Sequence, residues 1–306
     1  MSSAEQKQRL REAALVLAVV LGLASIFAVS RSMDAHRPPP DSALEEEKLY
    51  FTGNAARRFS LGFNGLMADW YWMRSLQYVG RKIMSVPDNV PIDDLGALNL
   101  KLLAPLLDTA TTLDPQFMEA YEYAAVVLPA VNVDEAIRIT KKGIAANPSA
   151  WQLYHHLGFI YWQRGDFQTA SEIYGAGAAT PDAPVWMQAM KARMAAEGGS
   201  RGTAREIYGR MYEEAADSQV KDMARRRLLQ LDSLDQRDIL RKLLVAYKGK
   251  TGHCVSSWRD VVGTLLALRF SVDTNGAPVD PSGTPYRLVK NGCDVDLDPT
   301  SEVPAK

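Results

Sequence analysis

The clearest apolar run in the chain lies near its start, from Ala13 to Val29, and it spans seventeen residues without a charge. About seventeen residues is the lower limit for a helix that crosses a bilayer. Basic residues flank the run on both sides, and the free α-amine favours an N-terminus inside the cytoplasm. We therefore expect residues 1–30 to form an uncleaved signal anchor. The alternative is a signal peptide cleaved after Ser30, and both export residues 31–306.

A spacer and then a helical pattern follow this run. Residues 31–48 are polar and contain three consecutive prolines, which favour an extended linker outside the cytoplasm. Apolar residues then recur at helical spacing in residues 61–81 and 95–113. Because the loop between these stretches is long, we predict an irregular, degenerate first helical hairpin within residues 49–116.

Residue types recur at an interval of 34 positions in the middle of the chain. Three alanines define the interval, and the residues four positions after them and twelve positions before them keep the same spacing. The recurring sets are Ala136, Ala170 and Ala204; Thr140, Tyr174 and Tyr208; and Ala124, Gly158 and Ala192. A fixed period of this length is typical of a stack of similar helical pairs, each packing on its neighbours.

The middle repeat shows the pattern most clearly. The residues that carry it are Tyr154, Leu157, Gly158 and Tyr161 on a first helix, and Ala170 and Tyr174 on a second helix after a Gly-Asp turn. The small residues let the two helices approach, and the large ones fill the space between them. This pattern resembles the tetratricopeptide repeat (TPR) family. The resemblance implies an all-α solenoid of helical hairpins, with three TPR units in residues 117–217.

The strict pattern stops after the third unit. One period beyond the last of the three alanines stands Asp238, which is neither small nor apolar. Apolar positions in residues 220–231 and 239–247 still indicate two helices. We therefore predict a degenerate fourth unit or cap in residues 218–252.

The final region, residues 253–306, has a different character. One more amphipathic helix is predicted over residues 255–270, and three glycine-containing turn sequences then predict a small β-hairpin or β-meander over residues 271–299. The two cysteines of the chain, Cys254 and Cys293, both lie in this region. In an exported domain we expect them to form a disulfide, with two unpaired structural thiols as the alternative.

Composition and motifs argue against several functional classes. A net charge of −1 and a pI near 6.5 discount nucleic-acid binding. The sequence has no nucleophile elbow, P-loop or zinc-protease motif, so we expect no enzyme, no cofactor and no metal. His155 and His156 are adjacent and therefore point about 100° apart on a helix. The alternating Asp294, Asp296 and Asp298 resemble the start of a calcium loop, but proline follows where that loop requires glycine.

The TPR resemblance also implies a binding surface. In that family the inner face of each first helix contacts the ligand, and the unit positions place there Tyr121, His155, Phe159, Trp162, Trp186 and Arg193. Aromatic residues and arginine are typical of binding hot spots. We therefore predict a groove for a segment of a protein partner; the alternative is that these rings pack against neighbouring repeats or the tail.

Two shorter resemblances bear on location. Residues 61–81 resemble the opening of membrane-anchored bacterial TPR proteins, through Gly62-Phe63, Ala68-Asp69, Trp72 and Gln77-Tyr78-Val79-Gly80. Residues 280–286, Asp-Pro-Ser-Gly-Thr-Pro-Tyr, resemble a segment of type II secretion pseudopilins, with a shared turn-and-strand solution as the alternative.

These expectations describe a single-pass protein of a bacterial cytoplasmic membrane with its domain on the periplasmic side. Its expected function is that of a scaffold or adaptor that grips a partner segment and helps to assemble an envelope complex, with pilus-like or secretion machinery as a candidate. The alternative is a permanent structural subunit of a membrane complex, such as a respiratory or transport assembly.

Overall fold

The computed structural model describes residues 17, 19–32, 52–86 and 95–305, and it divides the chain into two units, Met1–Phe51 and Thr52–Lys306. In the first unit, the described residues up to 32 are helical and exposed to solvent. Among the described residues, no helix combines the length and the apolar character that crossing a membrane requires. The start of the predicted anchor at Ala13 and almost all of the predicted spacer lie outside the described residues.

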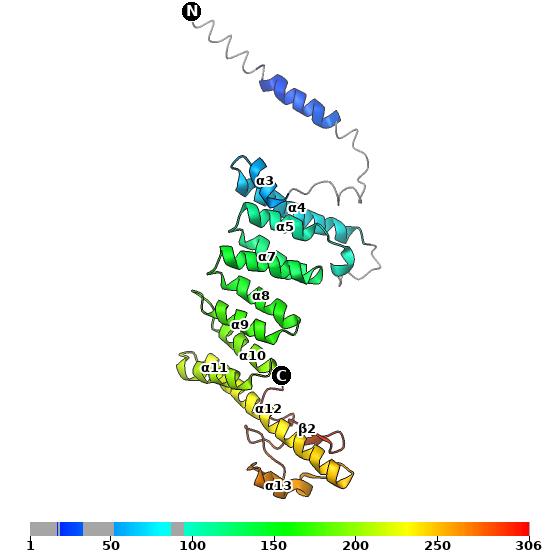
Figure 1. Ribbon diagram of the computed structural model, residues 1–306, viewed down its shortest axis with the longest axis vertical. Coiled ribbons are helices and arrows are strands. Elements are labelled where there is room, and N and C mark those ends of the chain that lie inside the picture. Colours follow the sequence, from blue (N-terminus) through cyan, green and yellow to red (C-terminus); the bar gives the residue numbers. More distant parts are fainter. Residues whose placement is uncertain (1–16, 18, 33–51, 87–94, 306) are drawn as a thin grey trace, which may run out of the picture. The chain divides into compact units, whose positions relative to one another are not determined.

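The second unit consists mainly of helices, which confirms the expectation of a mostly α-helical fold (Figure 1). Its helices are α3 (Gly53–Phe59), α4 (Asn64–Met84), α5 (Leu103–Leu113), α6 (Met118–Val127), α7 (Val133–Ala146), α8 (Trp151–Gln163), α9 (Phe167–Ala178), α10 (Trp186–Glu197), α11 (Arg201–Glu214), α12 (Ser218–Thr251) and α13 (Val262–Ala267). Short 3₁₀ turns are η1 (Leu95–Leu98), η2 (Leu128–Ala130) and η3 (Trp258–Val261). From α4 to α12, each helix packs on the helix that follows it in the chain.

The interval of 34 residues appears directly in the helix boundaries. Helices α7, α9 and α11 begin at Val133, Phe167 and Arg201, which are 34 residues apart. Asn132 and Asp166 precede the first two of these helices and accept a hydrogen bond from the backbone N–H three residues later, which satisfies an otherwise unpaired donor. The nine recurring small and aromatic residues of the sequence pattern are all buried. Local capping signals therefore mark the start of α7 and α9, whereas Ser200 before α11 makes no side-chain cap.

The hydrophobic core is divided into four clusters that follow one another along the chain. The first extends from α3 to α8, the second joins α8, α9 and α10, the third joins α10, α11 and α12, and the fourth joins α12 to the C-terminal region. Each cluster is formed by segments close in sequence.

Residues 218–252 form one helix instead of the two that were predicted. Helix α12 continues from Ser218 to Thr251 and ends at Gly252, whose φ of 81° is left-handed. The polar stretch between the predicted helices contains no glycine or proline, so nothing in the backbone stops the helix. Its carboxylates instead pair with α11: Arg205 donates to Asp232 and Asp235, at 3.1 Å and 2.7 Å.

Two other predicted helices are shorter than expected. The stretch over residues 95–113 is interrupted at Asn99, where φ is 51°, and only α5 continues to the predicted end. The helix predicted over residues 255–270 divides into η3 and α13 and ends before Arg269, whose φ is 64°. Both interruptions are left-handed backbone positions, which a helix cannot contain.

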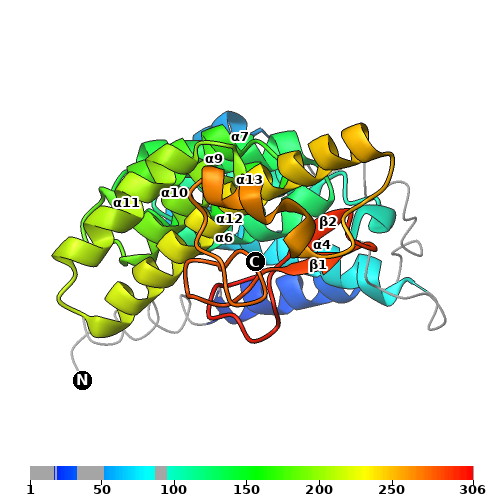
Figure 2. The ribbon, with the colours of Figure 1, turned by 90° about the horizontal axis from the view of Figure 1, so that it is seen from below.

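The predicted β-hairpin forms in the C-terminal region. Strands β1 (Arg287–Val289) and β2 (Asp294–Asp296) pair antiparallel, with Leu288 opposite Val295. Figure 2 shows this orange-to-red region beside α12, on which β2 packs. Tyr286 is buried at the contact, where its hydroxyl lies 2.9 Å from Ser233 Oγ and 2.9 Å from Gln236 Oε1. Residues 280–286, the segment that resembles pseudopilins, thus contact α12 through Tyr286 and help to hold this region against that helix.

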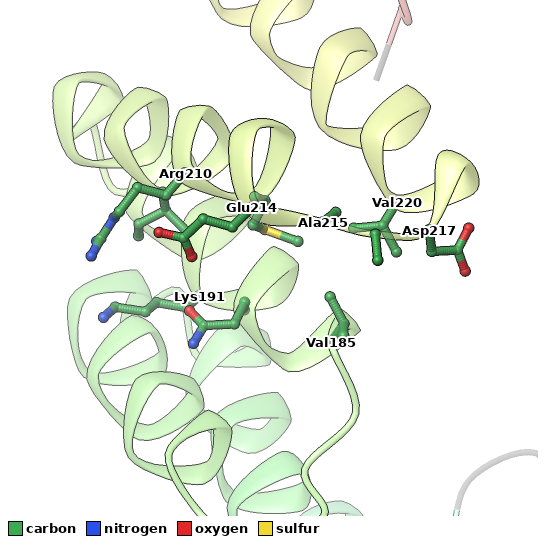
Figure 3. A pocket seen from close by; sticks show the side chains of 11 residues that line it. Val185, Lys191, Arg210, Glu214, Ala215, Asp217 and Val220 are labelled. Carbon is green, nitrogen blue, oxygen red and sulfur yellow. The ribbon is translucent and has the colours of Figure 1, made fainter.

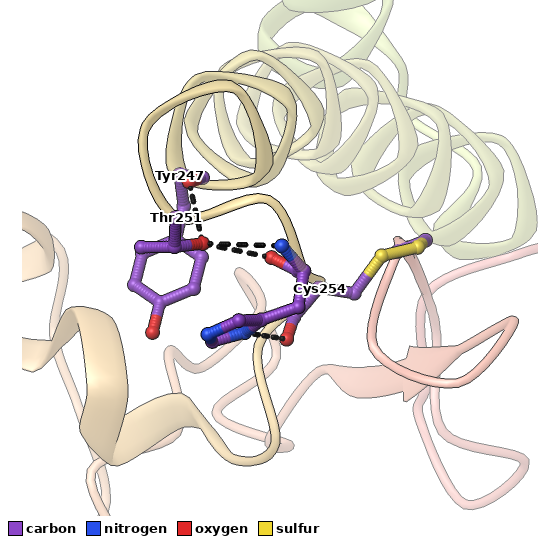
Figure 4. The surroundings of a disulfide bond; sticks show 5 residues. Tyr247, Thr251 and Cys254 are labelled. Carbon is purple, nitrogen blue, oxygen red and sulfur yellow. Dashed lines mark hydrogen bonds between the residues drawn. A yellow bond between two sulfur atoms is a disulfide. The ribbon is translucent and has the colours of Figure 1, made fainter.

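Cys254 and Cys293 form the predicted disulfide (Figure 4). Their Cα atoms lie 5.0 Å apart across a sequence separation of 39 residues. Beside the bond, Gly292 has a φ of 81°, and a Cβ on it would overlap the carbonyl oxygen of Val255. A glycine is therefore required where the two ends of the region meet. The disulfide joins the end of α12 to the turn before β2.

Candidate functional site

Five aromatic side chains of α8 and α10 lie in two contacting groups, and together we call them the aromatic face. It contains Trp151, His155, Phe159, Trp162 and Trp186. Trp186 contacts Trp151 and His155, with ring centroids 5.6 Å and 4.9 Å apart, and Phe159 contacts Trp162 at 5.6 Å. All three pairs meet edge to face, which is a favoured aromatic geometry. Phe159 and Trp186 remain 39% and 40% exposed.

Three polar groups meet at one end of the aromatic face. The Arg193 guanidinium lies over the Trp162 ring, 4.7 Å from its centroid. Trp162 Nε1 donates to Glu197 Oε2 at 3.0 Å, and Arg193 Nε donates to Glu197 Oε1 at 2.7 Å. Glu197 therefore balances the Arg193 charge and fixes the orientation of the indole. The sequence prediction had treated Arg193 as a polar member of the surface without this partner.

His155 lies between the aromatic face and the core. It contacts the ring of Trp186 on one side, and its Nδ1 lies 3.4 Å from the hydroxyl of Tyr174 on the other. Burial lowers the pKa of His155, and the neighbouring His156 lowers it further. Burial also lowers the pKa of His156. Both imidazoles are therefore neutral at pH 7, and this part of the face carries no charge.

Tyr121 does not belong to this surface. The prediction placed it on the groove floor, but the structure buries it completely, and its hydroxyl donates to the carbonyl of Thr111 at 3.3 Å. The reason lies on α7, where a Cβ on Gly143 would come within 2.8 Å of the Tyr121 ring. The absence of a side chain on Gly143 makes the space that Tyr121 fills. Burial raises the pKa of Tyr121 to about 12.

Two members of the site were missed by the sequence reasoning. Trp151 stands at the first position of its unit, outside the positions counted as inner face, yet it contacts Trp186. Glu197 stands four residues after Arg193, which is the spacing for an ion pair on a helix, and that spacing is a signal that could have identified it.

A cavity of about 310 Å³ adjoins the polar end of the aromatic face. Arg193 and Glu197 line it from α10, and further side chains come from α11, α12 and the C-terminal Ala305. Among them, Arg201 donates to Asp235 and Asp238 at 2.7 Å each. Because its arginines have acidic or polar partners, the cavity adjoins the aromatic face without creating a strong positive field.

A larger cavity of about 510 Å³ lies on the other side of α10, between α10, α11 and the start of α12 (Figure 3). Lys191, Arg210 and Glu214 gather at one end of it, and Val185 and Val220 lie at the other. Lys191 and Arg193 are two positions apart on α10 and therefore point in nearly opposite directions. The two cavities thus open on different faces.

The C-terminal aspartates have protein partners of their own. Asp294 accepts hydrogen bonds from Lys290 Nζ at 2.8 Å and Arg241 Nε at 3.0 Å, and the bond from Lys290 is the main reason that its pKa falls to about 2. Asp296 lies 3.4 Å from Arg237. Within the described ranges, no three His, Cys, Asp or Glu side chains come together as metal ligands would.

No protein-family model matches the chain, and no curated protein sequence matches it. The geometry of the described residues is therefore the basis for assigning a function.

Proposed function

We propose that the protein is an adaptor that binds a segment of a partner protein on its aromatic face, and that its helical pairs are TPR units. In this proposal Ala13 to Val29 anchor the chain in a bacterial cytoplasmic membrane, and the helical domain lies on the periplasmic side. The protein has a binding role and no catalytic one. Its partner belongs to an envelope assembly such as pilus-like or secretion machinery.

The repeat part of the proposal is supported by contacts that recur after 34 residues. The Tyr174 hydroxyl lies against His155, and one period later the Tyr208 hydroxyl donates to the carbonyl of Ala189 at 3.1 Å. Each contact joins the second helix of a pair to the first helix of the same pair. Equivalent positions thus have equivalent partners, as expected for units that share one packing solution.

The observation that carries the binding role is the exposure of Phe159 and Trp186 on helices with well-packed opposite sides. Leu153, Leu157 and Ile160 bury the other side of α8, and Met187 does the same for α10. The two exposed rings are therefore held by rigid elements, and little conformational entropy is lost when a partner covers them. Aromatic anchors of this kind dominate the energy of many interfaces.

The chemistry of the face indicates the kind of segment that fits it. The neutral aromatic centre favours an apolar anchor, and the Arg193–Glu197 pair at its end offers one donor and one acceptor group to the partner. An amphipathic helix with an aliphatic or aromatic side chain on its apolar side matches both features.

Site-specific photo-crosslinking in intact cells tests the binding role. A photoreactive phenylalanine analogue at position 159 or 186 should form an adduct with a defined partner, and the same analogue at Tyr212 should not. Tyr212 is a suitable control because it is 44% exposed but lies on α11, outside the aromatic face.

The identified partner then allows a measurement of affinity. Trp186→Ala should weaken binding by about 2 kcal/mol, roughly thirtyfold, while Tyr212→Ala leaves it unchanged. Melting temperatures of both variants provide the folding control. Equal adducts at positions 186 and 212, or unchanged affinity of a folded Trp186→Ala protein, would show that the aromatic face is not the binding site.

A further inference from the structure

Helices α3 and α4 expose a second apolar surface, which is separate from the aromatic face. It consists of Phe59, Leu61, Phe63, Leu66, Trp70 and Met73, and we call it the α3–α4 face. Their exposed fractions are 71%, 85%, 68%, 68%, 44% and 51%. Six large apolar side chains this exposed on two consecutive helices indicate an interaction site.

The α3–α4 face is distinct from the side of α4 that packs in the core. Leu66, Trp70 and Met73 follow one another at helical spacing of four and three residues, so they share one side of α4. Tyr71 and Tyr78 belong to a neighbouring side of the helix, which is buried. Helix α4 therefore uses one apolar side to fold and leaves a second apolar side in solvent.

The same segment carries a strong positive charge. Residues 52–86 contain five Lys or Arg residues and one acidic residue, Asp69, whereas the whole chain has a net charge of −1. Arg57 and Arg58 are exposed in the last turn of α3, directly before Phe59. The Arg74 guanidinium lies 5.4 Å from the centroid of the Trp70 ring. Exposed Asp69, near Leu66 on α4, is the one opposing charge of this segment.

We infer that the α3–α4 face docks on the surface of a bilayer that contains anionic lipid. Tryptophan, phenylalanine and leucine beside arginine are the residues of helices that lie in a membrane interface, where the apolar side chains enter the boundary between headgroups and acyl chains. Arginines at the edge of the face contact the anionic headgroups. The charge of Asp69 remains at headgroup level, which limits the depth of insertion to the outer part of the interface.

Charge complementarity favours a bilayer over a second copy of the chain. Two α3–α4 faces brought together would place two segments of the same positive sign against each other, which opposes association. An anionic bilayer instead offers negative charge at every point of contact with the rim of the face.

The length of the connecting chain is compatible with this placement. Twenty peptide units separate residue 32, the last described residue of the N-terminal helix, from Thr52, and they span at most about 70 Å. If the apolar run lies in a membrane, as proposed above, the α3–α4 face remains within reach of that membrane. The docking surface itself is assigned from α3 and α4 alone.

Fluorescence quenching in the full-length protein tests the inference. Both native cysteines form the disulfide, so Leu66→Cys supplies one thiol for the environment-sensitive dye NBD. The matched control is Val245→Cys on α12, because Leu66 and Val245 are both aliphatic and both 68% exposed. Each labelled protein is reconstituted in vesicles of phosphatidylcholine and phosphatidylglycerol, with and without a lipid that carries a doxyl quencher.

We expect the doxyl lipid to quench the dye at position 66 several-fold more than the dye at position 245. Reversal of charge in Arg57→Glu with Arg58→Glu should reduce the quenching at position 66, as should replacement of phosphatidylglycerol by phosphatidylcholine. Absence of lipid quenching at position 66, or equal quenching at both positions, would overturn the inference. The dye at position 66 could instead become shielded from water as the protein concentration rises, without being quenched by lipid. That result would show that a second copy of the chain covers the α3–α4 face, and it would also overturn the inference.

Discussion

A comparison of two glycine substitutions tests the close packing of α8 on α9. Gly158 lies where a Cβ would be 2.7 Å from Cε2 of Tyr174, whereas Gly209, in the interior of α11, has nothing within 4 Å of the equivalent point. Alanine at either position gains helix propensity, worth about 1 kcal/mol relative to glycine. Because this gain is common to both variants, the difference between them isolates the steric cost at position 158.

The magnitude of that cost follows from the geometry. Optimal carbon–carbon contacts lie at about 3.5–4.0 Å, so a Cβ at position 158 requires Tyr174 or its helix to move by about 1 Å. Overpacking of this degree in a core costs about 1–3 kcal/mol. Gly209→Ala should therefore stabilise the protein by about 0.5–1 kcal/mol, and Gly158→Ala should leave it near neutral or destabilise it by up to about 2 kcal/mol. Gly158→Leu should destabilise it further.

Thermal unfolding followed by circular dichroism measures the difference. In a domain of this size, 1 kcal/mol corresponds to about 2–4 °C in melting temperature, so the two alanine variants should differ by about 2–12 °C. An equal rise in melting temperature for Gly158→Ala and Gly209→Ala would refute the argument, since it would mean that α8 and α9 do not approach closely at Gly158.

Three further predictions concern the disulfide, the histidine pair and the contact between α11 and α12. Cys254→Ser with Cys293→Ser should lower the stability of the C-terminal region by about 3–4 kcal/mol, because without the disulfide the unfolded chain between the two positions, 39 residues apart, has more conformational entropy. Denaturation followed with a probe in that region measures this loss. Reactive thiols in the native wild-type protein would contradict the prediction. Stability should also fall as the pH decreases below about 6.5, because burial lowers the folded-state pKa of His155 and His156, so the unfolded chain binds more protons than the folded protein. Replacing both histidines with Gln should flatten this part of the plot of stability against pH. An unchanged slope would exclude the histidines as its cause. Asp235→Asn removes a carboxylate that pairs with two arginines of α11 at an exposed site, so it should cost no more than about 1 kcal/mol in low salt and less in high salt; a larger, salt-independent loss would point to a packing defect instead.

The second helices of the repeats could be predicted from the sequence because the signals for them are local. A cap residue such as Asp166 and a small residue such as Ala170 act within a few positions, and they recur at a constant interval. The β-hairpin was predictable for the same reason, since its turn requires residues such as Gly292 that tolerate positive φ.

The features that were not predicted depend on contacts between segments. The polar middle of α12 breaks the hydrophobic pattern but contains no helix-breaking residue, and its carboxylates pair with arginines of α11, a contact that the hydrophobic pattern does not show. Tyr121 is buried because Gly143 on another helix leaves room for it. The partnership of Arg193 with Trp162 and Glu197 likewise depends on how α8 and α10 meet.

The length of α12 has a mechanical consequence. Its 34 residues correspond to a rod of about 50 Å, and its first half packs on α11 whereas its second half carries the disulfide-bonded C-terminal region. Such a rod acts as a lever: a tilt of about 5° at the α11 contact displaces the far end by roughly 4 Å over this length. The cavity of about 510 Å³ between α10, α11 and the start of α12 lies beside this contact, so a tilt of α12 there would displace the C-terminal region, which is far from the cavity.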